Sequence, residues 1–364
     1  MKVLLLAGEE SGVIYAEKIA AEIRRRFPDA QVRGYGDWGF EISDLAVMGF
    51  GAVLRRIFYF LRVKRTMERA IGSWKPDVVC TVDYPGMNLK LAAYAKKRGI
   101  RTVHVVCPQV WAWKRGRVPK IERSIDCLCC FFPFEPQYFT PGFAHFVGHP
   151  LAESFERGAE EKNGRTLAVL PGSRVGEIEK ILPLQLQAAD MLGRSLAGQL
   201  EVVIPAANAK ARHAIEEVVA RHKGAIAVKV CEGGARALLC RADCATVASG
   251  TATLEAALAR CPTVLVYKVG RLLGWFARLV IKGISHVGLA NIIAEKAGVR
   301  CPMPELLQEN FTAESVAEEL GRYVADDDAR RAAVGRLEAV VRELGDGAGA
   351  VAKTVDEIFA FKEN

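Results

Sequence analysis

The sequence Ala-Val-Leu-Pro-Gly-Ser-Arg at residues 168–174 decides the fold. It joins an apolar run to a turn of small residues, after which helical periodicity begins. A similar transition occurs near the start of the chain, where Leu-Leu-Ala-Gly-Glu-Glu-Ser-Gly occupies residues 5–12. A strand that passes through a glycine-containing turn into a helix is the opening unit of a Rossmann-like domain. The chain is therefore predicted to contain two such domains.

Short apolar runs recur along the chain, generally with helical periodicity between them. They occupy residues 2–7, 77–82, 102–106, 125–132, 166–170, 200–204, 226–230, 242–248 and 262–267. Strands that alternate with helices predict parallel sheets built from β-α-β units. We predict an α/β protein with two Rossmann-like domains that face each other across a cleft. A polar linker at 154–165 divides it into domains 1–160 and 161–340, and a last helix at about 340–364 is expected to pack back on the first domain.

Composition indicates a globular protein with an anionic partner. Hydrophobic residues make up 51% of the 364 residues, enough for two well-formed cores. No stretch reaches the roughly 18 uninterrupted apolar residues of a membrane-spanning helix. Ten cysteines, several inside the apolar run 125–134, indicate buried thiols and a reducing cytoplasm. The net charge of +8 favours a nucleotide, a phosphorylated substrate or a phospholipid surface, and the sequence carries no motif that indicates nucleic acid as a partner.

Two turns in the second half have the features of phosphate-binding sites. Residues 170–174 combine a small-residue turn, backbone N–H groups and a guanidinium at the start of a helix. Residues 249–251 follow the run 242–248 and place hydroxyl groups and backbone donors at the start of another helix. Glu255 lies one turn inside that second helix. The alternative is ordinary N-capping of two helices, without a ligand.

Two segments in the first half carry candidate chemistry. Asp83 follows the apolar run 77–82, so its carboxylate lies just beyond the end of a predicted strand. Residues 105–121 contain two tryptophans among four cations, directly after another predicted strand. Ligands bind at such strand ends in open α/β sheets. The alternatives are that Asp83 caps the next helix and that Trp111 and Trp113 fill a domain interface.

Several motifs together resemble the lipid A disaccharide synthase family. They are Pro-Gln-Val-Trp-Ala-Trp-Lys at 108–114, Phe-Pro-Phe-Glu at 132–135, Val-Gly-His-Pro-Leu at 147–151, Gly-Glu-Glu-Ser-Gly at 8–12, Asp-Tyr-Pro-Gly-Met-Asn at 83–88 and Glu-Leu-Leu-Gln at 305–308. The resemblance extends from about residue 3 to 310. It implies a GT-B glycosyltransferase fold and an inverting transfer that joins two acylated glucosamines and releases UDP, without a metal or another cofactor. The implied substrates are UDP-2,3-diacylglucosamine and 2,3-diacylglucosamine 1-phosphate.

The resemblance also implies roles for individual residues. Asp83 is the expected general base for the acceptor hydroxyl, with Glu9 as a second candidate. The expected substrate-binding residues are Ser11, Gly12, Asn88, Gln109, Trp111 and Asn291. The expected UDP-binding residues are Ser173, Arg174, Ser249, Gly250, Thr251 and Glu255. No metal ligands are expected, because the histidines show no ligand spacing with cysteine or carboxylate along the sequence.

Three positions depart from the pattern that the family usually has. Val13 and Gly86 stand where the family usually has acids, and Ala290 stands where it often has proline. Two rival functions therefore stay open. One is another UDP-sugar enzyme of the same shape, such as a 2-epimerase or a transferase for a different lipid acceptor. The other is a UDP-binding scaffold without catalysis.

Two segments have the pattern of basic amphipathic helices. Residues 50–69 place apolar side chains at helical spacing beside Arg55, Arg62 and Arg69, and residues 271–282 show a similar pattern. Such helices suit an anionic membrane surface, although a globular core also needs amphipathic helices. For 50–69 we predict contact with membrane or acyl chains. The expected location is the cytoplasm, peripheral on the inner face of the cytoplasmic membrane.

Overall fold

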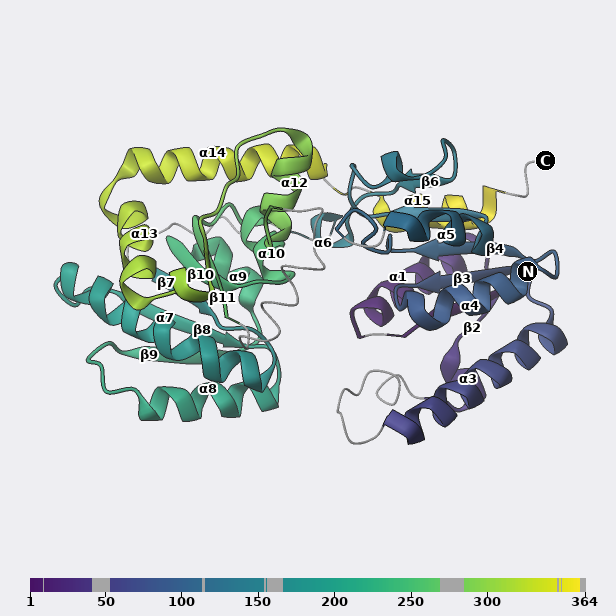
Figure 1. Cartoon of the computed structure of the whole chain (residues 1–364), viewed down its shortest axis with the longest axis horizontal. Coiled ribbons are helices and arrows are strands. Elements are labelled where there is room, and N and C mark those ends of the chain that lie inside the picture. The colour runs from purple at the N-terminus through teal and green to yellow at the C-terminus, as the bar shows by residue number, and fades with distance from the viewer. Residues whose placement is uncertain are drawn as a thin grey trace. The chain divides into compact units, whose positions relative to one another are not determined.

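The computed structural model describes residues 1–8, 10–40, 53–112, 115–153, 155, 166–268, 285–345, 347 and 349–360, with the side chains of 10, 11 and 53–57 left out. The chain forms two compact units (Figure 1). Unit 1 comprises Met1–Ser154 and Asp346–Asn364, and unit 2 comprises Phe155–Gly345. Each unit is built around a parallel sheet of six strands.

The sheet of unit 1 has the strand order β2-β1-β3-β4-β5-β6. Its strands are β1 (Lys2–Ala7), β2 (Gln31–Arg33), β3 (Val78–Val82), β4 (Arg101–Val105), β5 (Cys127–Cys130) and β6 (Ala144–Phe146). The central strands β3 and β5 are buried at every position. Strands covered by helices on both faces need apolar side chains on both faces, which is why these segments read as continuous apolar runs.

Helices cover both faces of this sheet. They are α1 (Glu10–Arg26), α3 (Val53–Trp74), α4 (Pro85–Lys96), α5 (Val118–Ser124), α6 (Pro150–Glu153) and α15 (Ala350–Phe359). Alternate residues of β1 point to opposite faces: Val3 and Leu5 join a core cluster with α1 and α15, whereas Leu4 and Leu6 join one with α3 and α4. The carboxy-terminal helix α15 is thus part of the core of unit 1, although unit 2 intervenes in the sequence.

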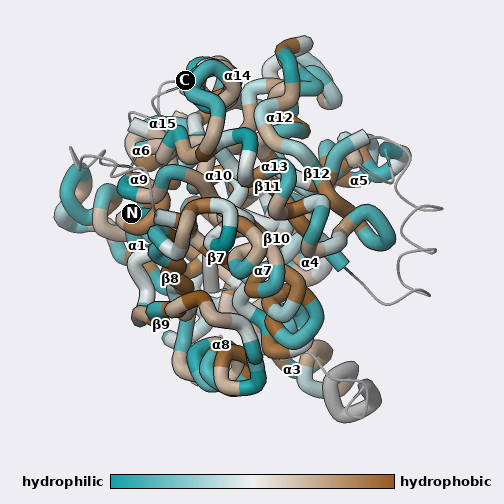
Figure 2. The backbone as a smooth tube through the Cα atoms, turned by 90° about the vertical axis from the view of Figure 1, so that its left-hand side faces the viewer, coloured by the Kyte–Doolittle hydropathy of each residue, from teal (hydrophilic) through white to brown (hydrophobic). Residues whose placement is uncertain are grey.

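The sheet of unit 2 has the strand order β12-β11-β10-β7-β8-β9. Its strands are β7 (Thr166–Leu170), β8 (Glu201–Ala206), β9 (Val228–Glu232), β10 (Cys244–Ala248), β11 (Thr263–Tyr267) and β12 (Glu305–Leu307). Its helices are α7 (Val175–Ser195), α8 (Ala209–Arg221), α9 (Ala235–Arg241), α10 (Ala252–Leu258), α12 (Leu289–Ala297), α13 (Ala313–Ala325) and α14 (Asp327–Leu344). This is the strand order of the dinucleotide-binding Rossmann fold. Helix α8 alternates between hydrophobic and hydrophilic residues along its turns, as expected for a helix with one face on a sheet (Figure 2).

The predicted α/β fold with two parallel sheets is confirmed, and a strand overlaps each of the nine predicted runs. Helix α3 is partly a core helix, since Val63 and Met67 are fully buried. Its apolar surface nevertheless extends outside the core, because Phe58 is 69% exposed and Leu61 is 40% exposed. Segment 271–282 lies outside the described residues. No helix within the described ranges is both long and apolar enough to span a bilayer.

Candidate functional site

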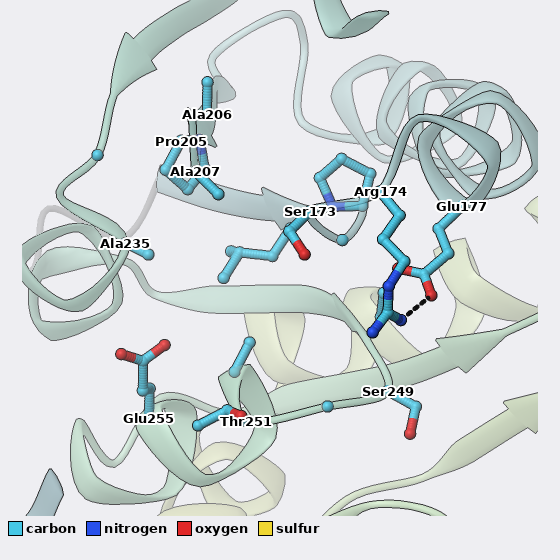
Figure 3. Close-up of a pocket in the computed structure, with 17 residues that line it drawn as sticks. Ser173, Arg174, Glu177, Pro205, Ala206, Ala207, Ala235, Ser249, Thr251 and Glu255 are labelled. Atoms are coloured by element: carbon cyan, nitrogen blue, oxygen red, sulfur yellow. Dashed lines mark hydrogen bonds and ion pairs between the residues drawn. The ribbon is translucent and has the colours of Figure 1, made fainter. Parts of the chain in front are cut away.

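Unit 2 contains a pocket of about 340 Å³ at the carboxyl ends of β7, β8 and β10. Strands β7 and β10 are neighbours in the sheet although two strands separate them in the sequence, so the chain reverses its direction of winding between them. In open α/β sheets this switch point is where ligands bind. Figure 3 shows Arg174 and Glu177 on one side of the pocket and Glu255 and Thr251 on another.

The turn between β7 and α7 forms one wall of the pocket. Gly172 has a φ of +106°, and a Cβ there would lie 2.8 Å from Oε2 of Glu177, so the turn requires glycine. Helix α7 begins after Arg174, whose side chain does not cap it, which leaves the positive end of the helix available to an anion. Ser173 and Arg174 are exposed, and Nη1 of Arg174 lies 2.8 Å from Oε1 of Glu177. A negatively charged ligand would meet a guanidinium and the start of a helix together.

The turn between β10 and α10 forms another wall. Gly250 has a φ of +152° and is exposed, as is Thr251, which precedes the first residue of α10. The hydroxyl of Ser249 is engaged within the protein, because it donates to the carbonyl of Val287 at 3.1 Å. Thr253, one turn further on, donates its hydroxyl to the carbonyl of Gly250 at 2.8 Å. Of the two predicted hydroxyl ligands, Thr251 is therefore the better placed to meet a bound molecule.

Glu255 lines the pocket from inside α10. Burial raises the pKa of its carboxyl group, and the positive charge of Arg236 opposes that shift. The carboxylate has no hydrogen-bond partner among the described residues, since only the backbone of Glu255 is bonded: its N–H donates to the carbonyl of Thr251, and its carbonyl accepts from the N–H of Ala259. A partly buried carboxylate without a partner suits hydroxyl groups of a ligand, which would restore the hydrogen bonds lost on burial.

In unit 1, Asp83 lies at the carboxyl end of β3 in an unusual backbone conformation. Asp83 and Tyr84 have φ values of 51° and 50°, so two consecutive non-glycine residues are left-handed. Each such residue costs about 1–3 kcal/mol, and residues of this kind cluster at functional sites. The half-buried Asp83 accepts a hydrogen bond from the backbone N–H of Tyr84 at 2.8 Å. A Cβ on Gly12 would lie 3.7 Å from Cβ of Asp83, so the start of α1 borders this carboxylate.

Asn88 stabilises the turn that carries Asp83. Its side chain is fully buried, and its amide nitrogen donates to the carbonyls of Leu6, Val82 and Asp83 at 3.2, 3.1 and 2.8 Å. Its amide oxygen accepts from the hydroxyl of Tyr35 at 2.8 Å. All hydrogen-bonding groups of the Asn88 amide are used inside the unit, which favours a positioning role, and its assignment to substrate binding stays a prediction.

Gly8 accommodates the ring of Tyr84. A Cβ on Gly8 would lie 2.6 Å from Cγ and Cδ1 of the ring, closer than any real contact of this kind. Tyr84 could not take its position beside a larger residue, and its backbone conformation belongs to the same turn as Asp83. The glycine after β1 therefore has a specific steric role in the turn after β3.

Comparisons with known proteins identify the family. The sequence profile of the family described as lipid-A-disaccharide synthetase matches residues 3–359. The lipid-A-disaccharide synthase of Chromohalobacter salexigens is 36% identical over 98% of this chain and 97% of its own length. The chain belongs to the lipid-A-disaccharide synthase family. The enzyme of the same name from Anaeromyxobacter dehalogenans strain 2CP-1 is 37% identical over 98% of this chain and 96% of its own length.

Solved structures confirm the GT-B fold that this family membership implies. A UDP-GlcNAc 2-epimerase from Neisseria meningitidis, bound to UDP-GlcNAc, has a TM-score of 0.61 at 11% identity, covering 99% of this chain and 100% of that one. A calicheamicin glycosyltransferase has a TM-score of 0.58 at 16% identity, covering 100% and 98%. At these identities the likeness is one of fold alone. Membership of the synthase family, rather than this likeness, distinguishes the chain from the epimerases.

Two residues that the family resemblance assigned to substrate binding are buried instead. Trp111 lies in the core of unit 1, and its indole N–H donates to Oε1 of Glu135 at 3.1 Å. Asn291 is fully buried, and its amide bonds to the backbone carbonyl and N–H of Met303 and to the carboxylate of Glu305. The polar groups of these side chains already have partners inside their own unit, which favours structural roles, and their assignment to substrate binding stays a prediction.

The remaining predicted residues differ in what the structure describes of them. Gln109 is exposed and free to meet a ligand from the surface. Glu9 lies outside the described residues, and for Ser11 only the backbone is described. The assignments of these three residues stay predictions.

Sequence reasoning did not identify four residues that bond to or act on the predicted site residues: Tyr35, Glu135, Glu177 and Arg236. Glu177 and Arg236 had a local signal, since both lie in helices that start at the pocket, α7 and α9. Tyr35 and Glu135 had none, because their partners are 53 and 24 residues away in the sequence.

Folding also joins cysteine, histidine and carboxylate groups that are distant in the sequence. Within the part of the chain that the structure describes, two groups have ligand atoms within 4.8 Å of one another, and neither lines the pocket of unit 2. They are Cys107, Cys130 and Glu135, and Cys127, His145 and Glu357. Spacing along the sequence was therefore an incomplete guide to ligand sets.

Proposed function

We propose that this protein transfers 2,3-diacylglucosamine from its UDP derivative to the 6-hydroxyl of 2,3-diacylglucosamine 1-phosphate, with inversion and without a metal ion. The observation that carries the proposal is the pocket at the switch point between β7 and β10, in a chain that belongs over nearly its whole length to the lipid-A-disaccharide synthase family. In this proposal Asp83 of unit 1 supplies the base and the pocket of unit 2 binds the donor.

The donor nucleotide occupies the pocket of unit 2 in this proposal. Its diphosphate lies against Arg174 and the first turn of α7, where a guanidinium and helix N–H groups supply positive charge. Glu255 accepts hydrogen bonds from the ribose hydroxyls, which supply the partners that its partly buried carboxylate lacks. These groups balance the charge that develops on UDP as it leaves, which is the role a metal ion has in other transferases.

Asp83 acts as the general base. It removes the proton from the acceptor 6-hydroxyl, whose oxygen then attacks the anomeric carbon of the donor from the face opposite UDP. The bond to UDP breaks with its electron pair, so the configuration at that carbon inverts. The left-handed turn held by Asn88 supports this role, because a strained backbone at a strand end is typical of a preorganised catalytic group.

The protein works at an anionic membrane surface, on the inner face of the cytoplasmic membrane. Support comes from α3, on which the exposed Phe58 and Leu61 accompany the exposed Arg62, Arg65 and Arg69. Apolar groups beside cations suit a headgroup region with negative lipids. The acyl chains of both substrates are held in such a surface.

A turnover assay with both acylated sugars, read by mass spectrometry, tests the proposal. The parent protein is expected to form the disaccharide and UDP, and Asp83→Asn is expected to reduce turnover by roughly 10²–10⁴ while UDP affinity is kept. Asp77→Asn is the matched control, since Asp77 precedes the same strand and bonds the backbone N–H of Lys2. Full activity of Asp83→Asn would assign the base to another residue. If the parent protein binds UDP but forms no product, the alternative of a UDP-binding scaffold without catalysis would be favoured.

A further inference from the structure

A cysteine, a histidine and a glutamate meet in unit 2 outside the groups assigned above to catalysis and UDP binding. Cys301 follows α12, His286 precedes it, and Glu305 begins β12. Sγ of Cys301 lies 3.1 Å from Nε2 of His286, and Nδ1 of the same ring lies 3.6 Å from Oε1 of Glu305. A nucleophile in contact with a base, which in turn faces a third group, is the arrangement that activates cysteine and serine for covalent chemistry.

The carboxylate of Glu305 is fixed in position by several hydrogen bonds. It accepts hydrogen bonds from the backbone N–H groups of Val287 and Gly288, both at 3.0 Å, and from the amide of Asn291 at 2.9 Å. The carboxylate that these donors fix faces Nδ1 of His286. The negative charge favours the tautomer with the proton on Nδ1. Nε2 is then a free base directed at the thiol of Cys301.

Cys301 is also accessible, unlike most cysteines of the chain. Seven of the ten are buried, and the three that are partly exposed are Cys231, Cys240 and Cys301. Among the described residues, neither Cys231 nor Cys240 has a histidine within hydrogen-bond reach. Of these three cysteines, Cys301 is therefore the one that is both accessible and next to a base.

We propose that Cys301 is a site of covalent thiol modification, activated by His286 and oriented through Glu305, that reacts with small disulfides and other soft electrophiles. In the reaction with a disulfide, the thiol proton passes to Nε2 of His286 as Sγ attacks one sulfur. A new S–S bond forms, the original S–S bond breaks, and the second sulfur leaves as a thiolate. The disulfide is the oxidant, so no further electron acceptor is needed.

The base is essential to this chemistry. Burial and the negative charges of Glu305 and Glu295 raise the pKa of the Cys301 thiol. A free thiolate is therefore scarce at neutral pH, and reactivity depends on proton transfer to the imidazole.

The modification is coupled to the UDP pocket through the segment that contains His286. The backbone N–H of Val287, the next residue, donates to the carboxylate of Glu305. The carbonyl of Val287 accepts a hydrogen bond from the hydroxyl of Ser249, which lines the pocket. A group attached to Cys301 beside His286 would displace this segment and weaken the wall that holds the nucleotide. This consequence rests on the proposed function, whereas the reactivity of Cys301 does not.

The decisive experiment is a labelling competition within one protein. The full chain is treated at pH 7 with limiting iodoacetamide, and alkylation of Cys301, Cys231 and Cys240 is followed by peptide mass spectrometry. Cys301 is expected to react at least about tenfold faster than the other two, and His286→Gln should remove that advantage. His213→Gln is the matched control, because His213 is an exposed histidine of the same unit that pairs with Glu217. Equal rates at the three cysteines, or an unchanged Cys301 rate in His286→Gln, would overturn the proposal.

The pH profile of the labelling rate provides a second measurement, compared between the parent and His286→Gln. At neutral pH Cys301 should react faster in the parent than in the variant, and the two rates should converge at alkaline pH, where the thiol ionises without a base. Oxidised glutathione should then form a mixed disulfide at Cys301 and lower UDP affinity. Unchanged UDP affinity after complete modification would refute the coupling. A parent without transferase activity would contradict the proposed function but would leave these labelling rates unaltered.

Discussion

Replacing Asn88 by alanine tests how the turn at Asp83 is held. The change removes all four hydrogen bonds that the buried amide makes to Tyr35 and to the carbonyls of Leu6, Val82 and Asp83. The buried hydroxyl of Tyr35 loses its only bonded partner among the described residues, and the carbonyl of Asp83 loses its donor. A buried polar group without a partner costs about 1–3 kcal/mol, so the Tyr35 hydroxyl alone predicts a loss of that size in the free energy of unfolding, and the partly buried carbonyl of Asp83 adds to it.

The companion variant Tyr35→Phe is expected to cost less. It removes one of the four bonds and leaves only the amide oxygen of Asn88 without a donor, which predicts a loss of about 1–3 kcal/mol. Lys90→Ala on the same helix is the matched control, since Lys90 is exposed. Turnover should fall in Asn88→Ala as well, because the left-handed backbone of Asp83 and Tyr84 loses the hydrogen bond from Asn88 that holds it.

Urea unfolding followed by tryptophan fluorescence measures these losses mainly in unit 1, which contains four of the five tryptophans of the chain, Trp38, Trp74, Trp111 and Trp113. The midpoint is expected to decrease in the order Lys90→Ala, Tyr35→Phe, Asn88→Ala. A midpoint for Asn88→Ala that equals that of Lys90→Ala would show that the amide does not hold the strand ends. The positioning role of Asn88 would then be wrong.

Three further predictions concern other parts of the chain. Arg174→Ala should weaken UDP binding by about 1.5–3 kcal/mol in calorimetry, as expected for a lost hydrogen bond to a charged group, and an unchanged affinity would contradict the phosphate assignment. Burial raises the pKa of Glu135 to about 8, so the parent should lose thermal stability as the pH rises from about 4.3 through that value, while Glu135→Gln should lose less; parallel melting curves would refute this. Reversing the charge of Arg62 and Arg69 should release the protein from anionic vesicles at about 1 kcal/mol per cation, and equal sedimentation of variant and parent would exclude membrane contact through α3.

The sequence alone determined the elements that repeat a pattern over several residues. A strand overlaps each of the nine apolar runs. A strand buried on both faces needs apolar side chains throughout, and such a run can be recognised from a few consecutive residues. The turn at 170–174 was also readable, since small residues before a helix leave few other conformations. What was missed are β2, β6 and β12, each of three residues. A three-residue strand has too little periodicity to be recognised, and its neighbours in the sheet define it.

Only the tertiary structure decided which polar residues face a ligand and which face the interior. The family resemblance assigned Asn88, Trp111 and Asn291 to substrate binding, yet their polar groups are satisfied by Tyr35, Glu135 and Glu305. Those partners lie 53, 24 and 14 residues away, so no local pattern announces them. The direction of a polar side chain is determined by whichever distant donor or acceptor the fold places beside it, because a buried group must be paired and an exposed one need not be.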